Sequence, residues 1–466
     1  MKVSDSTRRQ FIKTSSLGVA AFTIVPRHVL GGPGFVPPSD KVYVALVGAG
    51  GMARNNLLEL FKLDDVQVIS VADPAGMYSL EHTYYKGSGG RAPAKKLVED
   101  NYVKRGGNFR CSVYEDFRVM LEREKAVDAV LCATPDHLHA YVSVLAMRAG
   151  KHIYCEKPMT HNLWETRLVA RVARETGRAT QMGNRGSSQV GIRETIEYLR
   201  DGAIGEVREI HVWTPATRYG ADLLGRPVGD EVVPNDLNWD LWLGPREWRS
   251  FHADYHPFTW RDFWAFGSGA MGDFGCHDLN APVWAFDLPF PSRVSAYPAG
   301  LMNDEIVPPG TIMHFEFAPN SQRPAIKLTW YDGGLRPSKP HELGSFPLPP
   351  RGALYCGEKG VIQTDASGTA PRLFPESLRR KYQKPKPALK RSGGHHRDWI
   401  DACKGGDLAA SHFEKSAHLT AITQLGLLSL RTRKPIEWDS EKQEARGVPE
   451  AGAIIRGSYR RGWEPA

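Results

Sequence analysis

Apolar runs that suit buried parallel strands alternate with helical patterns along the first part of the chain. Val42 to Val47 and Val66 to Ala72 are continuous apolar and β-branched runs, which is typical of strands buried on both faces. The same patterns predict strands at 126–133, 151–155 and 179–182, and helices at 136–148 and 162–176. This alternation predicts a doubly wound parallel sheet that binds its ligand at the carboxyl ends of the strands.

The first strand runs directly into a G-x-G-x-x-A sequence that is followed by a helical pattern. Gly48 permits a tight turn, Gly50 lets the backbone approach a pyrophosphate, and Ala53 keeps the helix close to the strand. Gly51 and Met52 begin the helix, whose first N–H groups suit phosphates. The loop therefore predicts dinucleotide binding.

An acidic residue, Asp73, ends the second strand, 25 residues after the first glycine of the loop. A carboxylate there can accept hydrogen bonds from ribose hydroxyls, and it would repel a 2′-phosphate. We therefore predict NAD rather than NADP as the cofactor. The alternative is that Asp73 only caps the turn before Pro74.

Three further motifs resemble a known family. Thr134-Pro135, with His139 nearby, and Glu156-Lys157-Pro158 each follow a predicted strand, and Gly272 to His277 reads G-D-F-G-C-H. With the glycine loop, these motifs resemble the glucose–fructose oxidoreductase/inositol dehydrogenase (Gfo/Idh/MocA) family from residue 41 onward, and exported members from environmental bacteria in particular.

The resemblance implies an α/β fold: a Rossmann domain with a doubly wound parallel sheet, then an α/β domain with a large, open, mixed and mainly antiparallel sheet. Strands predicted at 207–214, 293–297, 311–317 and 325–331 agree. We expect the domains at 39–160 and 161–466, with the C-terminal segment returning to the first. One face of the second sheet often forms a subunit interface in this family, so a homo-oligomer, dimer or tetramer, is expected.

The family also implies the catalytic residues. Lys157 is expected beside the nicotinamide and the reacting hydroxyl, where burial would lower its pKa and its charge would stabilise an alkoxide. Asp273 and His277 are spaced i, i+4, so a helix would place both on one face. His277 is expected to accept the hydroxyl proton, and Asp273 to orient the imidazole or bind a substrate hydroxyl.

Other candidates depend on position alone. Glu156, Thr134, Pro135 and His139 are expected at the cofactor, although His139 has an equal claim to a capping role. Family members often carry an acid three residues after the catalytic histidine, where this chain has Asn280. Substrate-side candidates are Asn184 and Arg185, and residues that could shape a sugar pocket, with core packing favoured for each, are Trp213, Arg218, Tyr219, Trp239 and Trp242.

The N-terminal sequence resembles a twin-arginine export signal. Arg8-Arg9 precede Phe11 and Lys13, and an apolar run from Leu17 to Val25 follows. That run is shorter than the roughly 20 residues that span a bilayer. We therefore assign residues 1–38 to a signal and linker, and expect an exported or periplasmic protein that does not span the membrane. NAD is scarce outside the cytoplasm, so the cofactor would have to be loaded first and held tightly.

Composition and motif spacing argue against several other classes of protein. The net charge is +8, but no nucleic-acid-binding signature accompanies it, so no nucleic-acid partner is expected. The 6 cysteines lack metal-binding spacing, and no metal site is predicted. The basic stretch at 378–397 is interpreted as a solvated loop.

The leading hypothesis is an NAD-dependent oxidoreductase that transfers a hydride between tightly bound NAD and a secondary hydroxyl of a sugar, glycoside or inositol. One alternative is a glycoside-cleaving enzyme that acts by transient oxidation and elimination. The intact E-K-P sequence favours oxidation over cleavage. The other alternative, a non-catalytic exported sugar-binding protein, is disfavoured by the presence of Lys157, Asp273 and His277.

Overall fold

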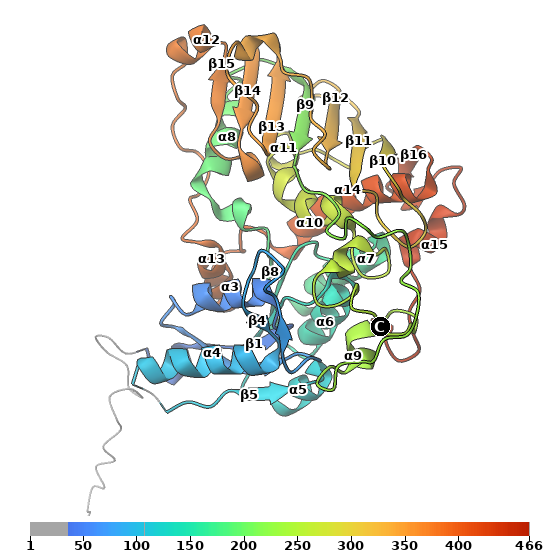
Figure 1. Cartoon of the computed structure of the whole chain (residues 1–466). Coiled ribbons are helices and arrows are strands. Elements are labelled where there is room, and N and C mark those ends of the chain that lie inside the picture. Colours follow the sequence, from blue (N-terminus) through green and yellow to red (C-terminus); the bar gives the residue numbers. More distant parts are fainter. Residues whose placement is uncertain (1–35, 107, 466) are drawn as a thin grey trace, which may run out of the picture. The chain divides into compact units, whose positions relative to one another are not determined.

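A six-stranded parallel sheet forms the core of the first domain in the computed structural model, which describes residues 36–106 and 108–465 (Figure 1). The twin-arginine sequence lies outside the described residues. The strand order is β5-β2-β1-β6-β7-β8, and all neighbours pair in parallel, which confirms the doubly wound prediction. The strands are β1 (Val42–Val47), β2 (Val66–Ala72), β5 (Ser112–Tyr114), β6 (Ala129–Cys132), β7 (His152–Cys155) and β8 (Thr180–Met182). The sheet thus continues beyond residue 160, where we expected the domain to end.

The helices of the first domain begin and end at recognisable caps. Asp116 accepts a hydrogen bond from the backbone of Arg118 at the start of α5, and Asn162 accepts one from Glu165 at the start of α7. Gly177 ends α7 in the left-handed conformation. The helices are α3 (Gly51–Leu60), α4 (Arg91–Lys104), α5 (Phe117–Arg123), α6 (Asp136–Arg148) and α7 (Leu163–Thr176), and a short hairpin of β3 (Tyr78–Ser79) and β4 (Ser88–Gly89) lies between β2 and α4.

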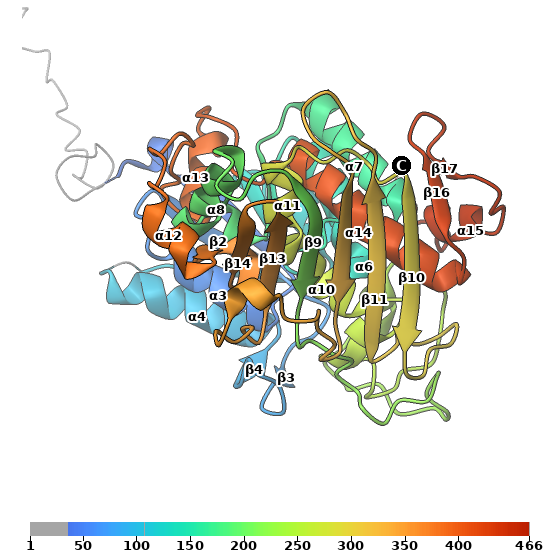
Figure 2. The ribbon, with the colours of Figure 1, turned by 90° about the horizontal axis from the view of Figure 1, so that it is seen from above.

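A nine-stranded sheet forms the second domain, in the order β15-β14-β13-β9-β12-β11-β10-β16-β17 (Figure 2). β9 and β12 pair in parallel and the other neighbours pair antiparallel, which confirms a mixed, mainly antiparallel sheet. The strands are β9 (Val207–Trp213), β10 (Arg293–Ala299), β11 (Gly310–Phe317), β12 (Ile326–Tyr331), β13 (Gly352–Gly357), β14 (Gly360–Thr364), β15 (Arg372–Phe374), β16 (Ile436–Asp439) and β17 (Glu444–Ala445). The sequence predicted β9 to β12 but not the other five.

Helices cover one face of this sheet, and α10, α11 and α14 lie behind it in Figure 2. Along β11, Met313 and Phe315 are buried, whereas Glu316 is exposed on the opposite face. Among the described residues, no helix has the length and apolar character that crossing a membrane requires. The helices of this part are α8 (Val190–Arg200), α9 (Trp239–Leu243), α10 (Gly269–Asp278), α11 (Asn280–Ala285), α12 (Glu376–Lys381), α13 (His395–Cys403), α14 (Phe413–Thr432) and α15 (Ala451–Arg456).

The chain returns to the first domain near its C-terminal end. Trp399 and Ile400 of α13 are fully buried in the same apolar cluster as Val44 of β1. The basic stretch at 378–397 is not simply a solvated loop, because it includes most of α12 and the start of α13, and Arg391 forms an ion pair of 2.7 Å with the buried Glu197 of α8. Complementary charge thus fixes a segment that has no apolar periodicity.

Candidate active site

The glycine loop between β1 and α3 has the geometry that a pyrophosphate requires. Gly48 has a φ of +82°, and a Cβ there would lie 2.6 Å from the backbone nitrogen of Thr134, so a larger residue would be both strained and obstructed. Gly50 is the N-cap of α3, and no side chain forms a capping hydrogen bond with the first N–H groups of the helix. These donors fit the phosphates of a dinucleotide.

Asp73 lies at the carboxyl end of β2 and lines the same cleft as the glycine loop. Its two carboxylate oxygens accept hydrogen bonds from the backbone nitrogens of Ala49, at 2.6 Å, and Ala75, at 2.8 Å. Each oxygen keeps a lone pair for a ribose hydroxyl, so the turn-capping alternative and the cofactor role are compatible. Burial raises the pKa of Asp73 to about 6, which leaves the group mainly ionised at pH 7 and repulsive to a 2′-phosphate.

His139 holds together the two loops that follow β6 and β7. Its Nδ1 lies 2.6 Å from the carbonyl oxygen of Pro158, and its Nε2 lies 2.9 Å from that of Thr134. Burial lowers its pKa to about 4, so the ring is neutral at pH 7. Pro135 and Glu156 complete these loops, and both line the cleft beside His139. The glycine loop, Thr134-Pro135 and Glu156-Lys157 therefore line one cleft.

Lys157 and Asp273 form an ion pair in this cleft. The Lys157 ammonium donates hydrogen bonds to Oδ1 of Asp273 and, at 2.9 Å, to its backbone oxygen. The Tyr219 hydroxyl donates to Oδ2 of the same carboxylate at 2.7 Å. Because Lys157 follows β7 and Asp273 belongs to α10, this pair joins the parallel sheet of the first domain to the second domain.

The charge state of the pair differs from the sequence prediction. Burial lowers the pKa of Lys157, but the charge and hydrogen bond of Asp273 outweigh it, so the pKa is raised. The predicted lowering is therefore wrong. Burial raises the pKa of Asp273, but Lys157 and Arg261 hold it well below its ordinary value. At neutral pH the pair is thus an ammonium and a carboxylate, which suits Lys157 to stabilise negative charge rather than to accept a proton.

His277 lies one turn after Asp273 on α10, as the spacing predicts, but it does not belong to the lining of the cleft. Burial, followed by the charge of Lys157, lowers its pKa well below the ordinary value, so its half-buried ring is neutral. A neutral imidazole can accept a proton. Asn280, which stands where family members carry an acid, is buried and donates to Oγ of Ser187 at 2.7 Å, so it packs α11 rather than facing the cleft.

Two ionisable side chains that line the cleft belong to none of the family motifs. Asp136 begins α6, and burial, followed by the charge of Asp273, raises its pKa to about 8. Arg261 belongs to the 3-10 helix η3 (Thr259–Asp262), and its Nε lies 3.7 Å from Oδ2 of Asp273. The position of Asp136 directly after Thr134-Pro135 is a signal that could have identified it, whereas nothing in the sequence distinguishes Arg261.

An aromatic segment of residues 74–90, the aromatic strap, covers the glycine loop. The ring of Tyr85 lies so close to Gly51 that a Cβ there would be 2.1 Å from its Cγ. Tyr78 packs edge-on against His256 of the second domain, with 4.6 Å between ring centroids. Asp236 accepts two hydrogen bonds from the backbone of the strap, at 2.7 and 2.9 Å. The strap therefore bridges the glycine loop and the second domain.

The candidates for a sugar pocket divide into residues at the cleft and residues that pack elsewhere. Trp242 lines the cleft, and Tyr219 contacts it through Asp273. Trp213 and Trp239 are buried in apolar clusters, and Arg218 bonds backbone carbonyl oxygens.

Neither predicted substrate-side residue lines the cleft. Asn184 donates to the carbonyl oxygen of Cys276 at 3.2 Å. Arg185 donates to Oδ1 of Asn56 at 2.7 Å, and the same Asn56 donates to Glu156 at 2.9 Å. Their position after β8 was inferred correctly, but their hydrogen-bond partners hold both side chains outside the lining of this cleft. They support the wall of the cofactor site instead.

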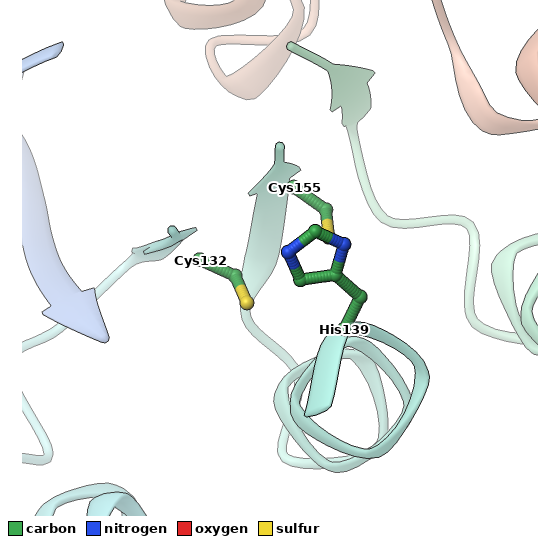
Figure 3. Close-up of side chains that lie close together, drawn as sticks. All are labelled: Cys132, His139 and Cys155. Carbon is green, nitrogen blue, oxygen red and sulfur yellow. The ribbon is translucent and has the colours of Figure 1, made fainter. Parts of the chain in front are cut away.

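Cys132, His139 and Cys155 lie together beneath the cleft (Figure 3). The two cysteines are register partners on β6 and β7, and the imidazole lies beside their sulfur atoms. Both ring nitrogens already face carbonyl oxygens, as described above, so neither is free for a metal ion in this arrangement. These three side chains pack together in the protein interior, behind the loop that contains Lys157.

Two family models match the chain. The model described as an oxidoreductase family with an NAD-binding Rossmann fold matches residues 42–184. The model of the C-terminal alpha/beta domain of the same oxidoreductase family matches residues 225–288. The first match contains the glycine loop and the E-K-P sequence, and the second contains Asp273 and His277.

Curated relatives match in part. A glycosyl hydrolase family 109 protein of Stenotrophomonas maltophilia is 26% identical over 243 residues, which are 52% of this chain and 48% of the relative. A dTDP-3,4-didehydro-2,6-dideoxy-alpha-D-glucose 3-reductase of Streptomyces violaceoruber is 35% identical over 178 residues, 36% of this chain and 50% of the relative. The chain thus spans about half the length of these relatives.

The fold recurs in solved structures. The WlbA dehydrogenase of Bordetella pertussis, solved in complex with NADH and UDP-GlcNAcA, superposes with a TM-score of 0.58 at 16% identity and covers 86% of this chain and 99% of that one. At this identity the likeness concerns the fold. The two family models identify residues 42–184 and 225–288 as parts of the Gfo/Idh/MocA oxidoreductase family, and the first of these as an NAD-binding Rossmann domain.

Proposed function

We propose that this protein transfers a hydride between tightly bound NAD and a secondary hydroxyl of a sugar, glycoside or inositol. The observation that carries the proposal is the buried Lys157–Asp273 pair in the cleft that begins at the glycine loop. Bound NAD supplies the acceptor for the hydride that leaves the carbinol carbon. The hydroxyl proton goes to a base, and the alcohol becomes a ketone.

The residues of the chain take the remaining roles. The Lys157 ammonium donates a hydrogen bond to the substrate oxygen and stabilises negative charge as the proton leaves. Asp273 fixes the position of that ammonium. His277, neutral at physiological pH, is the base that the sequence predicts, and because it lies outside the lining of the cleft, a bridging water would have to carry the proton to it. These roles suit oxidation because they provide a fixed positive charge and a separate proton acceptor.

The absorbance spectrum of the protein purified without added nucleotide tests this function. We expect a reduced-nicotinamide band at about 340 nm when the right sugar or inositol is added, because the retained NAD takes up the hydride. Protein denatured before sugar addition is the control. The proposal would be contradicted if the protein were purified without nucleotide and showed no absorbance change with any polyol and added NAD. That result would favour a sugar-binding protein.

Glycoside cleavage is the second candidate, since one curated relative is named a glycosyl hydrolase family 109 protein. Transient oxidation, elimination and re-reduction would release a sugar with no lasting change at about 340 nm. Release of p-nitrophenol from an aryl glycoside would therefore identify cleavage. We place this candidate second because the E-K-P sequence at 156–158, which the family resemblance links to oxidation rather than cleavage, is intact.

Tight retention of NAD is supported by the aromatic strap, which lies over Gly51 and contacts the second domain. Retention also suits the export that we propose from Arg8-Arg9, since a cofactor loaded in the cytoplasm must survive transport. Fractionation of an Arg8→Lys/Arg9→Lys double variant tests export, and an undiminished periplasmic fraction would argue against it.

We also propose a homo-oligomer, dimer or tetramer, that assembles through the face of the nine-stranded sheet that the described helices leave exposed. Arg293, Glu316, Lys327 and Glu209 are register neighbours across four strands and form an exposed row of alternating charge. Such a row can complement its own copy. Sedimentation equilibrium is expected to show that Lys327→Glu weakens the oligomer, while Lys96→Glu on the first domain does not. A monomeric wild-type protein would refute this proposal.

A further inference from the structure

Arg261 is an enclosed cation in the candidate active site. Its guanidinium lies 4.2 Å from the ring centroid of Trp260 and 4.6 Å from that of Phe258, and its side chain is only 14% exposed. The residue lines the same cleft as Lys157. Stacking of this kind holds the guanidinium plane in one orientation before any ligand binds.

The hydrogen-bonding capacity of Arg261 is only partly used. Nη1 donates to the carbonyl oxygen of Phe258 at 3.0 Å, and Nε lies 3.7 Å from Asp273, beyond a good hydrogen bond. Within the described residues, Nη2 has no hydrogen-bond partner. It also keeps some exposure to solvent. One edge of the guanidinium is therefore open to the cleft.

Around the Lys157–Asp273 pair, two cations face one ionised acid, and the other ionised acid of the cleft, Asp73, lies at the carboxyl end of β2. Lys157 and Arg261 are both cationic, and Asp273 is ionised between them. Asp136, which also lines the cleft, has a pKa raised to about 8 by burial and by Asp273, so it is mainly protonated at pH 7. A neutral sugar would leave the open edge of Arg261 without an anionic hydrogen-bond acceptor in a poorly solvated site.

We propose that the substrate is a sugar acid, such as a hexuronate, and that the open edge of Arg261 binds its carboxylate. This inference rests on the proposed function and names the substrate class of the same site. A guanidinium fixed by two aromatic rings matches the planar geometry of a carboxylate. Arg261 would thereby orient the sugar ring so that one hydroxyl reaches Lys157.

The phosphates of NAD present the same anionic chemistry, so the experiment separates the two sources. D-glucuronate and D-glucose are titrated into the NAD-loaded protein by calorimetry, and bound NAD per chain is measured after acid release. We expect the wild-type protein to bind glucuronate more tightly than glucose. Arg261→Gln should weaken glucuronate binding on the order of 10- to 100-fold, leave glucose binding unchanged and retain its NAD.

Arg249→Gln is the matched control. Arg249 is also an enclosed arginine, stacked on Tyr255 and Phe266 and paired with Glu305 at 3.0 Å, but it does not line the cleft. Its replacement should leave glucuronate binding unchanged. Arg261→Lys, which keeps the charge, should restore part of the binding, so that a folding defect of Arg261→Gln cannot be mistaken for lost recognition.

Two results would overturn the inference: equal binding of glucose and glucuronate by the wild-type protein, or loss of NAD from Arg261→Gln, which would assign Arg261 to the cofactor phosphates. Failure of the proposed function looks different. Glucuronate would still bind in an Arg261-dependent manner, but no sugar would produce the reduced-nicotinamide band.

Discussion

Replacement of Lys157 by alanine is expected to lower kcat/KM for the oxidised substrate by about 100- to 1000-fold, because the cleft loses the donor that stabilises charge on the substrate oxygen. The fold should survive the change. Asp273 keeps the hydrogen bond from Tyr219 at 2.7 Å and the nearby charge of Arg261, so its carboxylate is not left without partners. Stopped-flow reduction of the bound NAD measures this step directly.

Lys151→Ala provides the control for this experiment. Lys151 precedes β7, whereas Lys157 follows it, and its ammonium donates to the carbonyl oxygen of Val127 at 2.6 Å, away from the cleft. We expect near-normal rates of NAD reduction for this variant. If Lys157→Ala reduced its NAD as fast as Lys151→Ala, Lys157 would have no role in stabilising the substrate oxygen.

Replacement of Gly48 by alanine is expected to reduce the free energy of unfolding by about 3 kcal/mol, since strain and overpacking each cost about 1 to 3 kcal/mol. The φ of +82° disfavours any side chain, and the new Cβ would meet backbone atoms of Ala133 and Thr134 within 2.8 Å. These neighbours belong to the backbone after β6 and cannot rotate away. Urea denaturation monitored by circular dichroism measures the loss.

Gly150→Ala separates the two causes, because Gly150 has a similar φ of +78° with no atom within 4 Å of the new Cβ. We expect this variant to lose only the strain contribution, about 1 kcal/mol. Equal losses in the two variants would show that contact between the glycine loop and the β6 loop contributes nothing to stability.

Secondary structure was predicted most accurately from the sequence where one physical pattern dominates. Val42–Val47 and Val66–Ala72 match β1 and β2 residue for residue, because strands buried on both faces are continuous apolar runs. The helix 136–148 matches α6, which begins directly after Pro135. Lys157 and Asp273 were selected through family motifs, and the two side chains form an ion pair in the cleft, while their catalytic roles stay predictions.

Other features depend on contacts between distant segments and left no local pattern. β15 has three residues, too few for a period-2 pattern to be recognised. Arg261 reaches the cleft from a largely irregular part of the chain, where its aromatic neighbours resemble ordinary core residues. Asn184 and Arg185 were placed correctly after β8, but their orientation depends on Cys276 and Asn56, which periodicity cannot indicate.

The return of α13 to the first domain has a consequence for how the protein is made. Trp399 and Ile400 fill the core beside β1, so the apolar surface of the first domain is complete only when residue 403, the end of α13, has been synthesised. On the ribosome, part of the core of the nucleotide-binding half must therefore stay open to solvent until residue 403 of the 466 has been made. A nascent chain stalled before α13 would expose that surface to chaperones, and the finished protein would acquire its stability late and in one step.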